Sequence, residues 1–216
     1  MKLLHIPAKS NLEIKIPASE LKKLPKSLKK IGLVTTIQHL HQLPALKKQI
    51  KGARIAGQIL GCNIAAAEKC KNKVDAFLFI GTGEFHPIAV ALKTNKPVFV
   101  FNPVSQKLSR LDEKTVSDFK QQRKGALLKF LHAKNVGILV STKHGQLRFA
   151  EARKLKKKLE SEKQEASQRK KCYLFVFDTL DFSQLENFPF IDCWLNTACP
   201  RIVDGRGDII NWNELA

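Results

Sequence analysis

The sequence lacks several features that would assign it to common protein classes. No apolar run approaches the roughly 20 residues needed to span a bilayer, so we expect no membrane-spanning helix. The first residues, Met1–Pro7, contain no long apolar segment with a cleavage site, which argues against a secretory signal. The five cysteines are odd in number and irregularly spaced, which argues against a disulfide framework. We therefore expect a cytoplasmic protein whose cysteines remain reduced.

Acidic and aromatic residues are also scarce. Lys and Arg number 38 against 19 Asp and Glu, which gives a formal net charge of +19. A surface this basic attracts RNA, ribosomes or acidic proteins, although Lys-rich helix faces are often simply solvated. Aromatic residues make up only 7% of the chain and are sparse in the basic stretches, so stacking platforms for single-stranded nucleic acid are not evident.

Short apolar strands alternate with helical stretches along the chain. At 216 residues, the chain is long enough for one large domain or two smaller ones. Uniformly apolar runs such as 30–36, 76–80 and 136–141 predict buried parallel strands with helices on both faces. We predict an α/β fold of two similar small domains, residues 1–110 and 111–216, each a parallel β-sheet flanked by helices.

The remaining elements follow from the same patterns. Further strands are expected at 12–17, 53–56, 97–101, 172–177 and 191–195, and helices at 39–49, 65–70, 87–92, 105–125 and 147–168. Residues 31–36 and 136–141 share an apolar pattern that ends in hydroxyl side chains, which indicates a weak internal repeat. Because ligands bind outside the carboxyl ends of parallel strands, we expect the strand endings and the cysteines near them to face a shared crevice.

Two cysteines stand beside turn-forming residues. Cys62 follows the segment Gly57-Gln-Ile-Leu-Gly61, and Cys199 precedes Pro200. Their wide separation does not suit a zinc knuckle with closely spaced ligand pairs, but it suits thiolates brought together on an iron–sulfur cluster. Each could instead be a small buried apolar residue, the usual fate of a free cysteine. The core is the expected place for Cys172 and Cys193, which lie in apolar strands.

Two loops after predicted strands carry groups that can bind an anion. Gly81, Thr82 and Gly83 form a turn whose backbone amides and following helix N-terminus could receive a carboxylate, although the turn lacks the Gly-Lys-Ser/Thr ending of a P-loop. The corresponding loop in the second half, residues 141–146, offers hydrogen-bonding side chains, and Arg201 can supply positive charge. No Ser-His-Asp or paired-carboxylate arrangement stands out.

Five motifs, in chain order, carry a resemblance to a known family. They are Val-Thr-Thr-Ile-Gln-His at 34–39, Gly-Gln-Ile-Leu-Gly-Cys at 57–62, Asp-Ala-Phe-Leu-Phe-Ile-Gly-Thr-Gly-Glu-Phe-His-Pro at 75–87, Ser-Thr-Lys-His-Gly-Gln at 141–146 and Thr-Ala-Cys-Pro-Arg-Ile at 197–202. Over residues 3–215 the chain resembles the archaeal diphthamide-biosynthesis enzyme family, the 2-(3-amino-3-carboxypropyl)histidine synthases.

The resemblance implies three similar α/β domains that each give one cysteine to a 4Fe–4S cluster, with Cys62 matching the second family cysteine and Cys199 the third. It further implies that S-adenosylmethionine binds the open iron and is cleaved reductively at its Cγ–S bond. The 3-amino-3-carboxypropyl group is then transferred to a histidine of translation elongation factor 2. The methionine part would be held by the two loops and one arginine, namely Gly81, Thr82, Gly83, Ser141, Thr142, Gln146 and Arg201. The Cys-x₃-Cys-x₂-Cys motif of ordinary radical S-adenosylmethionine enzymes is absent.

The sequence departs from the family pattern because the first domain and its cysteine are not found. We expect a separate subunit to supply them. The chain could instead be degenerate and non-catalytic, or Cys70 could act as a substitute ligand. The alternative function is a basic structural or RNA-binding partner that keeps the fold without the chemistry. If the chain is part of the enzyme, we expect it to contact nucleic acid only through the elongation factor or through its non-specific basic surface. Either a homo-oligomer or a hetero-oligomer is possible.

Overall fold

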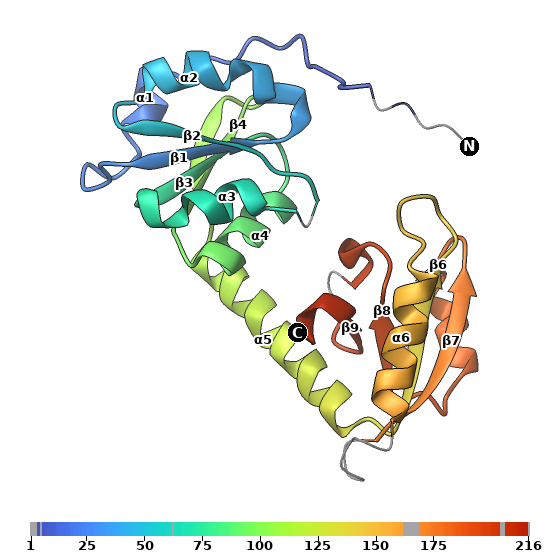
Figure 1. The fold of residues 1–216 in the computed structure, drawn as a ribbon. Coiled ribbons are helices and arrows are strands. Elements are labelled where there is room, and N and C mark those ends of the chain that lie inside the picture. The colour runs from blue at the N-terminus through green and yellow to red at the C-terminus, as the bar shows by residue number, and fades with distance from the viewer. Residues whose placement is uncertain (1–3, 5, 62, 162–168, 204–205, 216) are drawn as a thin grey trace. The chain divides into compact units, whose positions relative to one another are not determined.

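The computed structural model describes residues 4, 6–61, 63–161, 169–203 and 206–215 (Figure 1). The chain divides into two compact units, residues 1–117 and 118–216, and the division falls within α5 (Glu113–His132). The sequence places its boundary slightly earlier, after residue 110. Both units are built from a parallel or mainly parallel sheet with flanking helices, which confirms the predicted α/β fold class.

The first unit contains a five-stranded sheet in the order β2-β1-β3-β4-β5, in which only β5 runs antiparallel to its neighbour. The strands are β1 (Ile31–Thr35), β2 (Ala53–Gln58), β3 (Ala76–Ile80), β4 (Val98–Asn102) and β5 (Lys107–Arg110). The helices are α1 (Ala18–Leu21), η1 (Ile37–Gln42), α2 (Leu43–Gln49), α3 (Ala65–Cys70), η2 (Lys71–Lys73) and α4 (Phe85–Thr94). Figure 1 shows α1 and α2 on one face of this sheet and α3 and α4 on the other.

Alternation along the central strands explains why both faces are covered. Leu33 and Leu78 pack in the core beneath α2, whereas Val34 and Phe79 pack in the core beneath α3 and α4. Strands buried on both faces read as continuous apolar runs, which is why β1 and β3 could be predicted from the sequence.

The second unit contains a four-stranded, fully parallel sheet in the order β7-β6-β8-β9. Its strands are β6 (Asn135–Ser141), β7 (Lys171–Phe177), β8 (Cys193–Asn196) and β9 (Ile209–Asn211). Helices α5 and α6 (Phe149–Glu160) contribute Phe130 and Ala152 to the core on one face. On the other face η3 (Phe182–Asn187) and η4 (Pro200–Val203) contribute Leu185 and Val203, and η5 (Trp212–Glu214) follows β9.

The two units repeat the same strand order. Counted within each unit, the order is second, first, third, fourth, and the first unit adds β5 at the edge. Ile31 pairs with Ala53 and Ala76, and Val136 pairs with Cys172 and Cys193, which sets the two sheets in one common register. The weak internal repeat predicted from residues 31–36 and 136–141 is therefore confirmed.

A carboxylate fastens the start of the first strand in each unit. Asp75, just before β3, accepts hydrogen bonds from the backbone N–H groups of Lys29 and Lys30 at 2.8 and 2.9 Å. Asp192, just before β8, accepts from the backbone N–H groups of Lys134 and Asn135 at 3.0 and 2.7 Å. The repeat thus extends from sheet order to individual hydrogen bonds.

The predicted elements were wrong in two places. Residues 12–17 form no strand, because the backbone N–H groups of Ile14 and Ile16 donate to the side chains of Gln42 and Gln49 instead of to a neighbouring strand. The predicted helix 105–125 is instead strand β5 followed by α5. None of the helices in the described part of the chain is long and apolar enough to cross a membrane.

Candidate metal centre

Cys199 lies between the end of β8 and the start of η4, at the carboxyl edge of the second sheet. The residue is partly exposed, whereas Cys70, Cys172 and Cys193 are buried. Cys62, the other expected ligand, lies outside the described residues. Among the cysteines that the structure describes, only Cys199 is therefore open to a ligand at the surface.

The buried thiols of the second unit are unsuited to bind a metal. Burial raises the pKa of Cys172 and of Cys193 to about 11, so both stay protonated at neutral pH. Metal ligands are thiolates, and a thiol kept protonated in an apolar core is inert. Their predicted core positions are confirmed.

Cys70 is buried at the end of α3, in the same core cluster as Ala67 and Val74. A side chain that packs in this way does not face a strand end, where the candidate ligands lie. Its packing argues against the idea that Cys70 replaces a missing cluster ligand.

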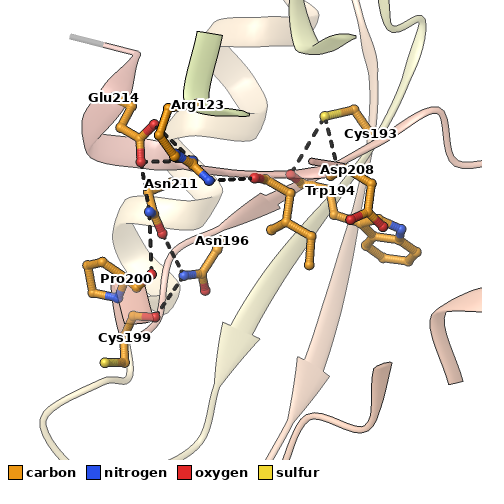
Figure 2. Close-up of polar contacts among 10 residues, drawn as sticks. Arg123, Cys193, Trp194, Asn196, Cys199, Pro200, Asp208, Asn211 and Glu214 are labelled. Carbon is orange, nitrogen blue, oxygen red and sulfur yellow. Dashed lines mark hydrogen bonds and ion pairs between the residues drawn. The ribbon is translucent and has the colours of Figure 1, made fainter. Parts of the chain in front are cut away.

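Figure 2 shows that Cys199 is held by its main chain. The Nδ2 group of Asn196, the last residue of β8, donates to the Cys199 carbonyl oxygen at 2.9 Å. The Oδ1 atom of Asn196 accepts from the backbone N–H of Ala198 at 3.0 Å. In the figure the Cys199 carbonyl faces Asn196 and the sulfur points away from it, so the contact with Asn196 does not engage the thiol.

Further polar groups extend this contact toward α5. Asn196 Nδ2 also donates to Asn211 Oδ1 at 2.8 Å, and Asn211 Nδ2 donates to Glu214 Oε1 at 2.8 Å. Arg123 donates to both carboxylate oxygens of Glu214 at 2.8 and 2.9 Å, and to the Ile209 carbonyl at 3.1 Å. Sequence reasoning missed these residues; their only signal was an asparagine at the end of two otherwise apolar strands, β8 and β9.

The predicted loop 141–146 leaves β6, which neighbours β8 in the sheet, at the same carboxyl edge as Cys199. Ser141 is buried, and its Oγ accepts from the backbone N–H of Lys143 at 3.1 Å. Thr142 is exposed and donates to Asp178 Oδ1 at 3.1 Å. Gln146 is half-buried and Arg201, in η4, is exposed. The second unit therefore brings four of the expected cofactor-binding residues to the sheet edge that carries Cys199.

The predicted residues Gly81, Thr82 and Gly83 form the loop after β3 in the first unit. Gly81 has φ +154° and Gly83 has φ +77°, conformations that favour glycine. A Cβ atom on Gly81 would lie 2.8 Å from the ring of Phe79, so only glycine fits there. Counted from the paired strands, Thr82 occupies in the first unit the place that Cys199 occupies in the second.

The donor set of the described residues can supply part of a metal site. Within that part of the chain, no group of three or more His, Cys, Asp or Glu side chains could hold a metal ion. Iron–sulfur clusters are held by cysteine thiolates, and Cys199 is a partly exposed cysteine in the loop after β8. The residues therefore fit a single ligand position of a cluster that other thiolates must complete.

Comparison with known proteins identifies the family of this chain. Residues 1–205 match the family described as "Putative diphthamide synthesis protein". The chain belongs to this family. It is 36% identical over 196 residues to the 2-(3-amino-3-carboxypropyl)histidine synthase of Pyrococcus horikoshii, a match that covers 85% of the chain and 53% of the relative. The chain thus spans about half the length of the curated relatives it matches.

Other members of the family agree in fold and in name. The crystal structure of Dph2 from Pyrococcus horikoshii matches with a TM-score of 0.73 and 31% identity, over 94% of this chain and 61% of that one. A second structure of that protein, with a 4Fe–4S cluster, has a TM-score of 0.71 and 32% identity, over 91% and 58%. The relative from Schizosaccharomyces pombe, 28% identical over 94% of this chain and 48% of its own length, is named subunit 1 of the synthase.

Proposed function

We propose that this chain is part of a 2-(3-amino-3-carboxypropyl)histidine synthase, the transferase of the first step of diphthamide synthesis. The observation that carries the proposal is Cys199, a partly exposed cysteine whose backbone is held by Asn196 at the end of a parallel strand in a Dph2-like fold. The 4Fe–4S cluster in a related structure supports an iron–sulfur role for such a thiol. In this proposal the group transferred comes from S-adenosylmethionine, and the acceptor is a histidine of translation elongation factor 2.

Cys62 and Cys199 each supply one thiolate to a 4Fe–4S cluster in this proposal. When bound, the cluster supplies the electron that cleaves the Cγ–S bond of S-adenosylmethionine. The backbone amides of Gly81, Thr82 and Gly83 and the side chains of the second unit receive the carboxylate and amino groups of the methionine part. The side chains of the second unit in this role are those of Ser141, Thr142, Gln146 and Arg201. The positive charge of Arg201 favours the carboxylate.

We propose that a partner subunit supplies a further thiolate. The burial of Cys70, Cys172 and Cys193 supports this, because none of these three thiols lies at the protein surface. The naming of eukaryotic relatives as subunit 1 of the synthase supports membership of a complex. Cys62 and Cys199 are the thiols that this chain would contribute.

The test is anaerobic reconstitution of the chain with iron and sulfide, together with a candidate partner. We expect a visible absorption band typical of an iron–sulfur cluster, and loss of that band in Cys199→Ala and in Cys62→Ala. Cys193→Ala is the matched control, since it removes a thiol of the same unit that lies in β8 and in the buried core. Transfer of label from carboxyl-labelled S-adenosylmethionine to elongation factor 2 then measures activity.

The proposal is wrong if no cluster forms with any partner, or if Cys199→Ala keeps a wild-type cluster. Salt-dependent RNA binding that survives both cysteine substitutions would in that case favour the structural alternative.

A further inference from the structure

The Cys199 loop is connected to helix α5 by an unbroken series of polar contacts. From Cys199 the contacts run through the carboxamides of Asn196 and Asn211 to the carboxylate of Glu214, and from there to the guanidinium of Arg123. All of these groups lie within the second unit. Figure 2 shows the series as one continuous run of dashed lines.

Burial makes these contacts obligatory. Asn196 is completely buried and Asn211 is 5% exposed, so neither amide can turn to solvent for a partner. A buried polar group without a hydrogen bond is costly, and a fully satisfied network fixes one arrangement of its members. Each asparagine here uses both ends of its amide, which leaves only one consistent orientation for the series.

The charged end of the series is also fixed. The guanidinium of Arg123 meets the Glu214 carboxylate through two parallel hydrogen bonds, an arrangement that adds geometric specificity to the charge pair. The side chain of Arg123 is 13% exposed, and its third contact, to the Ile209 carbonyl, ties it to β9. Helix α5 therefore sets the position of Glu214, and Glu214 sets the orientation of Asn211.

We propose that Asn196, Asn211, Glu214 and Arg123 form a relay of positioning residues that holds the Cys199 backbone and so presents its thiolate to the cluster. The cluster part of this inference rests on the proposed function. Outer contacts that orient a ligand are worth about 10–100-fold in metal affinity in known metal sites. The relay contacts the carbonyl of Cys199 and leaves its sulfur free, as a positioning role requires.

The test uses two variants and one control. Asn196→Asp keeps the size and the acceptor for Ala198 but loses both donated hydrogen bonds. Asn211→Ala interrupts the relay one step further from Cys199, and it carries the test if Asn196→Asp does not fold. Asp192→Asn is the control, since it alters hydrogen bonds of the same unit at the amino end of β6.

Two readouts separate this proposal from the proposed function. The first uses the chain without a cluster: hydrogen exchange at the Ile202 amide, whose acceptor is the Cys199 carbonyl at 3.0 Å. We expect both relay variants to exchange several-fold faster there, and the control to match wild type. The second uses the reconstituted complex: the rate of iron loss to a chelator, expected to rise about tenfold in the relay variants.

Wild-type exchange at Ile202 and wild-type iron loss in the relay variants would overturn the relay while leaving the proposed function intact. An equal effect of Asp192→Asn would also overturn it, because the cause would then be general loss of stability. If wild type binds no cluster, the proposed function fails, and faster exchange at Ile202 still supports the relay as the anchor of the Cys199 loop.

Discussion

In the first unit, the loop after the third strand begins with Gly81, Thr82 and Gly83, and its conformation depends on two glycines with positive φ. In the second unit, the loop between the third strand and η4 consists of Thr197, Ala198 and Cys199, and the side chain of Asn196 contacts its backbone at Ala198 and Cys199. The sheets beneath these loops share strand order and register. The same arrangement of strands thus carries a glycine-rich turn in the first unit and, in the second unit, a cysteine whose backbone is held by a side chain.

The scaffold shared by the two units includes a close contact between a glycine and a ring. Gly32 on β1 lies against Phe77 on β3, and Gly137 on β6 lies against Trp194 on β8. A Cβ atom on Gly32 would lie 2.8 Å from the Phe77 ring, and one on Gly137 would lie closer still to Trp194. The Trp194 ring is confined by Phe175 and Phe188, with centroids 4.8 and 6.3 Å away.

The largest effect is therefore expected from Gly137→Ala. Because Trp194 cannot yield easily, the substitution should lower the free energy of unfolding of the second unit by about 3 kcal/mol, the upper end for overpacking. Gly32→Ala should cost the first unit about 1–2 kcal/mol by the same principle. Denaturant unfolding followed by hydrogen exchange in each unit measures both, since the two units need not unfold together.

Gly125→Ala is the control for these two substitutions. Gly125 lies in α5 with nothing within 4 Å of an added Cβ, so alanine should leave stability unchanged or raise it by up to about 1 kcal/mol. Equal losses at Gly32, Gly125 and Gly137 would contradict the account based on ring contact.

A second difference lies in the thiols of the second sheet. Cys172 and Cys193 occupy the register positions that Ala53 and Ala76 occupy in the first sheet. Burial raises the pKa of both thiols to about 11 in the folded protein, from the ordinary pKa of 9.0 expected in the unfolded chain. The stability that the two protonated thiols contribute is therefore fully present below pH 9.0. As the pH rises from 9.0 toward 11, the unfolded thiols ionise first and the second unit should lose stability.

The double variant Cys172→Ala, Cys193→Ala places alanine at both positions, as in the first sheet. The stability of its second unit should therefore fall less between pH 9.0 and about 11 than that of wild type. Unfolding midpoints of the second unit between pH 8 and about 11 provide the measurement. If the double variant keeps the wild-type slope, other groups such as lysines cause the loss.

The sequence was sufficient to predict most of the strands but not the contacts around the site. Buried strands such as β1, β3 and β6 are continuous apolar runs, a signal that needs no tertiary information. Strand β5 was missed because only Leu108 of its residues is buried, and the rest of Lys107–Arg110 is polar.

Cys199 could be identified as a candidate ligand from its neighbours in the sequence, but the residues that hold its backbone could not. Asn196 and Asn211 meet only because β8 and β9 are adjacent in the sheet, and Glu214 and Arg123 come from elements far apart in the chain. Such contacts depend on the tertiary fold, and no local spacing predicts them. The roles of Cys62 and of the loop residues in cofactor binding remain predictions.

A smaller effect is expected from Gly83→Ala in the first unit. Nothing lies within 4 Å of an added Cβ at Gly83, so the cost is the backbone strain of φ +77° alone, about 1 kcal/mol. The corresponding place in the second unit is Pro200, which cannot adopt this conformation. Hydrogen exchange should rise near α4 and stay unchanged in the second unit. A change in the second unit would show that the loops are not independent.

The smallest effect concerns the carboxylate that fastens β1. Hydrogen bonds from the backbone N–H groups of Lys30 and Lys29 hold the pKa of Asp75 below its ordinary value. A lowered folded pKa means that this stabilisation is complete above the unfolded pKa, near 3.8, and disappears as the pH falls through the folded value. Asp75→Asn should therefore lower the unfolding midpoint of the first unit at pH 7, and the difference from wild type should shrink below about pH 4. A difference that stays constant across this range would show that the negative charge of Asp75 contributes nothing to the clamp.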